Sequence, residues 1–362
     1  MCAAAHPVPV SQTDGPSPDR VVAAWPRHRP LAALVSLTPP NAGGWSLLAA
    51  PVRWRVRGRG ALGRGPEAVA GLRRALQPPG GLAATADDAA DGPVPFGAGW
   101  IASLAYELGR SLEPAVERPA VPLDRAGPGA ADAPVPRSRD DRGWRDLLMA
   151  RVTGGLAFDH AAGRWWWFGD ASVDVRDELV AAVRMAERGE RTPPEPFSIL
   201  GPERRSLEDA AHEAAVAEAR RAIAAGEIFQ ANITRRRTLT CAGSIRDLAI
   251  AALAAARPRY GAVLEAPGGR GLVSMSPESF LDVHRRPDGL RVARTRPIKG
   301  TLAAADSAAG DAGPAELLAS PKDAAELTMI VDLMRHDLGR VAVPGGVRVS
   351  QPRHVETHAT VH

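Results

Sequence analysis

The most distinctive stretch of the chain reads Lys322-Asp323-Ala324-Ala325-Glu326-Leu327-Thr328-Met329-Ile330-Val331-Asp332-Leu333-Met334-Arg335-His336-Asp337-Leu338-Gly339-Arg340-Val341. It predicts one long helix that begins at about Lys322 and ends near Gly339. Asp323 and Glu326 are three residues apart, so both carboxylates lie on one face of its first turn. Carboxylates there commonly serve as caps that suit the helix dipole. The functional alternative is a Mg²⁺ site built from one or two carboxylates and a substrate anion.

The chain has 45 lysines and arginines, and only two of them are lysines, Lys322 and Lys299. Lys299 lies in Arg296-Pro297-Ile298-Lys299-Gly300-Thr301, which ends a predicted strand and turns at the glycine. An arginine stays protonated at physiological pH, whereas a buried lysine amine can lose its proton and act as a nucleophile or base. Burial and the like charge of neighbouring arginines would lower the pKa of Lys299. The plain alternative is a surface lysine at a strand end.

Glu278 stands in Ser276-Pro277-Glu278, between two apolar segments that we expect to be strands. A carboxylic acid that is partly removed from water there would have a raised pKa and would suit a general acid. The other interpretation is a turn residue whose carboxylate lies in water, and for Glu278 taken alone this one is favoured.

Composition limits the class of protein. A chain of 362 residues with 45% hydrophobic residues is expected to form two domains or one large one. The net charge of +4 is small, and the run Arg235-Arg236-Arg237 resembles a solvated strand end, so we expect no nucleic-acid partner. No apolar stretch reaches the roughly 18 to 20 residues that span a bilayer. The first residues lack a secretory signal, and two cysteines are too few for a disulfide framework, so we expect a cytoplasmic protein.

The order of elements predicts an α+β architecture. We expect a poorly ordered terminus over residues 1–30, a first domain over 31–188, a linker over 189–205 and a second domain over 206–362. The expected helices lie at 66–76, 173–188, 206–225, 244–256 and 322–339. The expected strands lie at 45–48, 52–56, 147–152, 164–168, 229–234, 259–265, 271–275, 279–284 and 290–296.

Several of these motifs, in this order, resemble one family. They are Gly99-Trp100-Ile101 with Tyr106 to Gly109, then residues 225–233, 276–278, 296–301 and 322–341. Together they resemble the chorismate-utilising enzymes, which include component I of anthranilate synthase and component I of aminodeoxychorismate synthase. The resemblance implies large, mostly antiparallel sheets flanked by helices. It also implies an anthranilate synthase component I-like N-terminal domain, followed by a chorismate-binding domain.

The resemblance also implies roles for single residues. Anthranilate and isochorismate synthases resemble each other in having alanine at the position of Lys299, and lysine there marks the aminodeoxychorismate type. In that type the lysine amine attacks C2 of chorismate, the 4-hydroxyl leaves and ammonia adds at C4. Glu278 would then be the general acid/base, and Gly300 and Thr301 would contact the substrate. Glu326, and more weakly Asp323, would bind Mg²⁺.

The resemblance further implies partners and points to departures. Ammonia would come from a separate glutamine amidotransferase subunit, component II. Isochorismate and salicylate synthases have a lysine near the position of Gln230 that activates water, so the glutamine here argues against water as the nucleophile. His336 replaces the usual asparagine of the family. Relatives continue beyond the position of His362, so we expect this chain to be truncated and, by itself, inactive and poorly soluble. The alternatives are an anthranilate synthase component I, and an inactive fragment or non-catalytic module that binds an amino acid.

Overall fold

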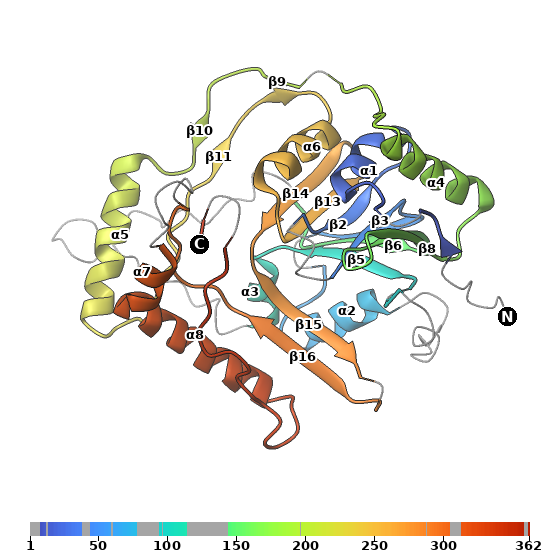
Figure 1. Cartoon of the computed structure of the whole chain (residues 1–362). Helices are drawn as coiled ribbons and strands as arrows, with labels where there is room; N and C mark the ends of the chain where they lie inside the picture. Colours follow the sequence, from blue (N-terminus) through green and yellow to red (C-terminus); the bar gives the residue numbers. More distant parts are fainter. Residues whose placement is uncertain are drawn as a thin grey trace. The chain divides into compact units, whose positions relative to one another are not determined.

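The structure is a computed structural model that describes residues 8–11, 14–37, 44–58, 61–77, 94–95, 97–113, 144–195, 197–286, 288–304, 313–357 and 361–362 (Figure 1). The chain forms two compact units. The first comprises Met1–Thr192 with Ala249–His362, and the second comprises Pro193–Leu248. Each unit is described by itself. Helices and antiparallel sheets occur together, so the α+β prediction is confirmed.

The first unit is built on a seven-stranded sheet in which every neighbouring pair is antiparallel. Its order is β1 (Val8–Pro9), β8 (Arg164–Gly169), β7 (Gly154–Asp159), β3 (Trp45–Ala49), β2 (Ala32–Val35), β13 (Tyr260–Ala266) and β14 (Arg270–Ser276). Its core includes Trp25, Trp165 and Leu179, which are completely buried. Trp25 directly follows α1 (Pro18–Ala24), and Leu179 lies on α4 (Val173–Glu187), so apolar faces of both helices belong to this core.

A three-stranded antiparallel sheet carries the remaining N-terminal elements. Its order is β4 (Arg53–Arg57), β6 (Leu147–Val152) and β5 (Gly99–Leu104). All six residues of β6 are buried, as expected for a central strand covered on both faces. The helices α2 (Pro66–Leu76) and α3 (Leu108–Leu112) contribute Ala75 and Leu108 to a cluster with the β6 residues Leu147 and Met149.

The motif-bearing part of the first unit follows β14. The strands β15 (Ser279–Arg285) and β16 (Arg291–Arg296) form a hairpin, and α7 (Gly313–Ala319) and α8 (Pro321–Gly339) come after it (Figure 1). Ser320 is the N-cap of α8, because its Oγ accepts a hydrogen bond of 3.2 Å from the backbone N–H of Asp323. Pro321 occupies the first turn, where its missing N–H costs nothing. The long helix predicted over 322–339 is therefore confirmed.

The second unit contains the helix α5 (Asp209–Ala224) and two short antiparallel pairs. β10 (Arg204–Arg205) pairs with β11 (Arg237–Thr238), and β9 (Ser198–Ile199) pairs with β12 (Cys241–Ala242). The helix α6 (Ile245–Ala256) begins in this unit and continues into the first. α5 ends before Gly226, whose φ of 74° is the left-handed conformation that glycine adopts most readily after a helix.

Two local predictions from the sequence disagree with the structure. No strand forms over residues 229–234, although apolar and polar residues alternate there. Alternation stabilises a strand only when a neighbouring strand takes up its backbone hydrogen bonds, and Phe229 here is 87% exposed. Residues 18–25, expected to be poorly ordered, form α1 and bury Val21 and Val22 completely. Their apolar side chains share one helix face with Trp25, which anchors the segment.

The compact units divide the chain at other positions than the predicted domains. The sequence places a linker at 189–205 and begins a second domain there, whereas the compact second unit comprises only Pro193–Leu248. The strands β13 and β14, predicted to belong to the second domain, instead extend the sheet that begins with β1. Their backbone pairing with β2 joins the two sequence halves, because four residue pairs of β2 and β13 lie in register. The domain boundaries drawn from the sequence stay a prediction.

Candidate active site

The segment from Arg296 to Leu302 carries Lys299 and follows β16 directly. It turns at Gly300, whose φ of 80° lies in the left-handed region. Lys299 is half-buried. Within the described part of the chain, its ammonium group has no hydrogen bond or ion pair.

Glu278 lies in the short connection between β14 and β15, and its side chain is exposed. Its Oε1 accepts a hydrogen bond of 3.1 Å from the backbone N–H of Ile298. The backbone N–H of Glu278 is in turn 3.3 Å from the Oγ of Ser276. Glu278 is therefore an exposed turn residue, as the second of the two sequence interpretations predicts. Its carboxylate is also held beside Ile298, the residue that precedes Lys299. The hydrogen bond joins Glu278 to Ile298, 20 positions further along the chain, and Lys299 follows Ile298 directly.

Asp323 approaches the same segment from α8. A Cβ added to Gly300 would lie 3.0 Å from the carboxyl carbon of Asp323 and 3.1 Å from Cδ2 of Leu317. Such distances are tighter than ordinary Cβ contacts, so a side chain at 300 would require its neighbours to shift, and glycine permits the close approach as well as the turn. Ser320 occupies the N-cap position of α8. Asp323 is therefore not the N-cap residue, although its carboxylate still lies in the first turn, where it suits the helix dipole.

A Mg²⁺ site would rest on few protein ligands. Asp323 and Glu326 are half-buried on the first two turns of α8. No group of three or more histidine, cysteine, aspartate or glutamate side chains gathers as a metal site among the residues that the structure describes. Mg²⁺ is commonly held by one or two carboxylates, with water and substrate oxygens completing its octahedron. The donor set fits that mode of binding, and Mg²⁺ stays a prediction.

The structure also brings residues to this segment that the sequence analysis did not identify. The carboxylate of Glu356 forms ion pairs with Arg296 and with Arg259, the latter at 3.1 Å. Leu302 exchanges two backbone hydrogen bonds with His362, of 3.1 and 2.8 Å. These partners are 60 or more positions apart in the chain, and no local pattern indicates such pairings. Thr301 is exposed.

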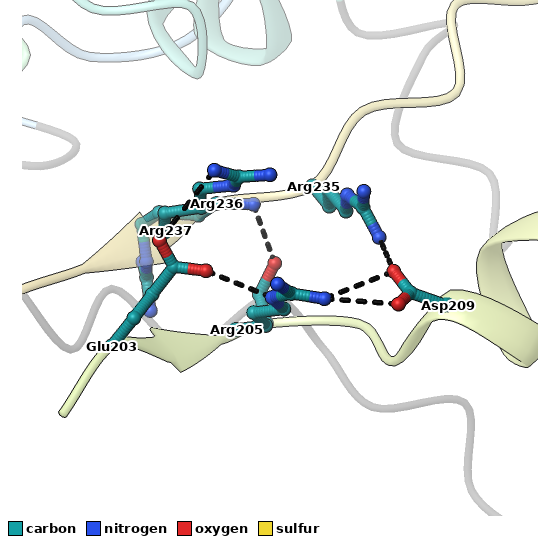
Figure 2. A network of polar contacts seen from close by, with 7 residues as sticks. Glu203, Arg205, Asp209, Arg235, Arg236 and Arg237 are labelled. Carbon is teal, nitrogen blue, oxygen red and sulfur yellow. Dashed lines mark hydrogen bonds and ion pairs between the residues drawn. The ribbon is translucent and has the colours of Figure 1, made fainter.

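A separate polar network lies in the second unit (Figure 2). Arg205 donates hydrogen bonds to Glu203 at 2.8 Å and to both oxygens of Asp209 at 3.0 and 3.1 Å. Arg235 pairs with the same aspartate, and Arg237 lies 3.6 Å from Glu203. Two arginines of the run expected to be a solvated strand end, Arg235 and Arg237, are thus tied to carboxylates. The hydrogen bond from Arg235 is the main cause that lowers the pKa of Asp209, and the bond from Arg205 lowers the pKa of Glu203.

Comparison with known proteins gives three findings. The family described as chorismate binding enzyme matches residues 128–362. Over 222 residues the chain is 37% identical to an aminodeoxychorismate synthase of Streptomyces pristinaespiralis, covering 57% of this chain and 30% of that protein. Over 359 residues it is 30% identical to anthranilate synthase component 1 of Streptomyces coelicolor, covering 92% of this chain and 64% of that protein.

A solved structure shares the fold. Anthranilate synthase component I from Streptococcus pneumoniae superposes with a TM-score of 0.55 at 19% identity, over 88% of this chain and 68% of that one. The chain thus spans less than two thirds of the length of both sequence relatives. In the described residues, no helix has the length and apolar character needed to cross a membrane.

Proposed function

Because the chain belongs to the family of chorismate-binding enzymes, we propose that it serves in the amination of chorismate at C4, which gives 4-amino-4-deoxychorismate for para-aminobenzoate and folate synthesis. The observation that carries this proposal is the state of Lys299. Its amine has no partner among the described residues, while its backbone segment is held by Glu278 and packs on Asp323. A fixed backbone with an uncommitted amine suits a nucleophile.

The proposed reaction balances over two steps. In the first, the Nζ of Lys299 forms a bond to C2 of chorismate, the ring double bonds shift, and the C4–O bond breaks. Glu278 supplies the proton with which the hydroxyl leaves as water, and Nζ loses one proton. In the second, ammonia forms a bond to C4, the ring double bonds shift back and the C2–Nζ bond breaks. One proton of the added ammonia goes to Nζ, which returns Lys299 as an amine. A Mg²⁺ ion held by Glu326, and more weakly by Asp323, would neutralise and orient a substrate carboxylate.

The ammonia source is part of the proposal. The relatives include proteins named as component 1 of a synthase. We propose a glutamine amidotransferase subunit as the partner that supplies ammonia. Free ammonium salts replace such a partner in the assay below, so the chemistry at Lys299 can be tested without it.

The test uses the unusual lysine content of the chain. The protein is incubated with chorismate and MgCl₂ without ammonia, and intact-protein mass spectrometry follows the mass. We expect an adduct whose mass is that of chorismate less one water, and peptide mapping should place it on Lys299. Lys299→Arg should abolish it while keeping the positive charge. Lys322→Arg is the matched control, because it changes the only other lysine and should keep the adduct. Adding ammonium chloride should release 4-amino-4-deoxychorismate, and this result would overturn the expectation that the chain is inactive by itself.

Anthranilate synthase component 1 is the second candidate, because its Streptomyces coelicolor relative covers 92% of this chain. Amination at C2 needs no lysine adduct. Fluorescent anthranilate that still forms in Lys299→Ala would favour this candidate and would contradict the first. A wild-type protein that binds chorismate with Mg²⁺ in a calorimetric titration, yet never gains the adduct mass, would also contradict the lysine mechanism.

A further inference from the structure

We propose that Glu356 is a positioning residue, whose carboxylate holds Arg296 and Arg259 together and thereby fixes the segment that presents Lys299. The geometry carries this inference, and only its consequence for catalysis rests on the proposed function. Glu356 does not touch the amine in this account. It acts through Arg296, which lies three residues before Lys299 in the chain.

The carboxylate of Glu356 bridges two separate elements. One oxygen, Oε1, pairs with the guanidinium of Arg296 at the end of β16, and Oε2 lies 3.1 Å from Nη1 of Arg259, just before β13. The side chain of Glu356 is 24% exposed and that of Arg259 is 21% exposed. Partial removal from water strengthens such charge-assisted hydrogen bonds compared with pairs on an open surface. β13 is a central strand of the seven-stranded sheet, so the bridge ties the Lys299 segment to a rigid support.

A second contact holds the other side of Lys299. Leu302, three residues after it, exchanges two backbone hydrogen bonds with His362, and Ala303 forms an isolated bridge with Val361. Arg353 donates to the carbonyl oxygens of Leu317 and Ser320 at 2.7 and 3.2 Å. The described residues of 353–362 therefore contact the segment on both sides of the lysine, as well as the connection that leads into α8.

Loss of the Glu356 charge has a defined consequence. Without it the two guanidinium groups keep their positive charges but lose the anion that they share, and like charges at short range repel. The end of β16 would then leave its support, and Lys299 would become more accessible and less well oriented. The two changes have opposite effects on two reactions. A small reagent that modifies amines would react faster with Lys299, whereas the reaction with chorismate, which needs a well-oriented amine, would become slower.

The experiment measures both reactions in Glu356→Gln. Brief labelling with acetic anhydride is followed by peptide mass spectrometry, and the labelling of Lys299 is divided by that of Lys322 in the same molecules. We expect this ratio to rise about threefold to tenfold, which corresponds to the loss of one charge-assisted hydrogen bond between partly exposed side chains. The rate of the chorismate adduct should fall by a similar factor. Glu356→Asp keeps the charge at shorter reach and should give intermediate values.

Two further variants separate positioning from general loosening. Arg259→Gln in the Glu356→Gln background removes one of the two uncompensated charges and should restore part of both values. Glu203→Gln is the matched control, because it also removes a carboxylate placed between two arginines, but in the second unit (Figure 2). It should leave the labelling ratio at the wild-type value.

The outcomes are distinct. An unchanged labelling ratio in Glu356→Gln overturns the inference, and so does an equal change in Glu203→Gln. A ratio and an adduct rate that rise together would show loosening without positioning and would overturn it as well. If the wild-type protein forms no adduct, the proposed function fails, and the labelling ratio still decides whether Glu356 fixes the Lys299 segment.

Discussion

The carboxylate of Glu278 accepts a 3.1 Å hydrogen bond from the backbone N–H of Ile298, the residue before Lys299. A side chain from the β14–β15 connection thereby fixes the backbone of the segment that carries the proposed nucleophile. The same residue is exposed. Glu278 therefore has an observed contribution as a hydrogen-bond acceptor and a proposed contribution as an acid.

Glu278→Gln separates these contributions. The amide oxygen can still accept from Ile298, so we expect the free energy of unfolding to stay within about 0.5 kcal/mol of the wild-type value in urea titrations. The chorismate adduct on Lys299 should form far more slowly, because an amide cannot supply the proton for the leaving hydroxyl. Glu278→Ala should lose the adduct and also about 0.5 to 1 kcal/mol of stability. Equal adduct rates in Glu278→Gln and wild type would remove Glu278 from the chemistry.

Gly300→Ala should destabilise the protein by about 1 to 3 kcal/mol in the same titrations. Two causes add: the φ of 80° strains any residue with a Cβ, and this Cβ would lie 3.0 Å from the carboxyl carbon of Asp323. Gly345→Ala is the control for the first cause, because Gly345 has a φ of 74° and, among the described residues, no atom lies within 4 Å of its added Cβ. The larger loss in Gly300→Ala measures the crowding against Asp323. Equal losses would show that the close approach is unimportant for stability.

Much of the fold follows from local sequence patterns. The helices at 66–76 and 321–339 begin with proline in the first turn, and their bounds match the prediction to within one residue. The pairing of β13 with β2 could not be predicted, because it joins residues more than 200 positions apart. The absence of a strand at 229–234 could not be predicted for the same reason, because strand formation depends on a partner from elsewhere in the chain. Alternation predicts what a strand would bury, but whether a partner strand lies beside it is a property of the tertiary fold.

The candidate site shows the same limit. Lys299, Gly300 and Glu278 could be identified from residue type, turn chemistry and family resemblance, and the structure places them in one neighbourhood. Glu356 carries no local signal, because a lone glutamate between threonine and valine is typical of many surface segments. Its contacts to Arg296 and Arg259 depend on long-range packing. Sequence patterns therefore indicate reactive groups better than the residues that hold them in place.

His160 should make the stability of the first unit depend on pH. Its Nε2 lies 2.8 Å from the Oγ of the buried Ser46. Burial lowers the pKa of His160 below its ordinary value of 6.5, and the charge of Asp159 opposes this only in part. Because the unfolded chain then binds the proton more readily than the folded one, stability is complete above pH 6.5 and falls as the pH decreases through the folded pKa.

Urea midpoints between pH 7.5 and 5 measure this dependence. His160→Gln should give a flatter profile, because its amide can keep a hydrogen bond to Ser46 and does not titrate. His354→Gln changes an exposed histidine and should keep the wild-type slope. A His160→Gln protein with the wild-type slope would assign the pH dependence to other groups.

The arginine network of the second unit should lose its effect in acid (Figure 2). Hydrogen bonds and charge from Arg235 and Arg205 lower the pKa of Asp209 below its ordinary value of 3.8. A lowered carboxyl pKa contributes stability that is present above the ordinary value and is lost as the pH falls through the folded one. Asp209→Asn should therefore have a lower urea midpoint than wild type at pH 7, and the difference should shrink below about pH 4.

The control for this prediction is Asp332→Asn. Asp332 is 79% exposed and forms a single pair of 3.4 Å with Arg335 on α8, so its removal should change the midpoint little at any pH. Asp209 differs because two arginines, from β10 and from the segment before β11, share its carboxylate at the start of α5. Removing it releases both arginines and one end of a helix together. If both variants behave alike at pH 7, the network contributes no more than an ordinary surface pair, and the fold of residues 193–248 must depend on its apolar contacts instead.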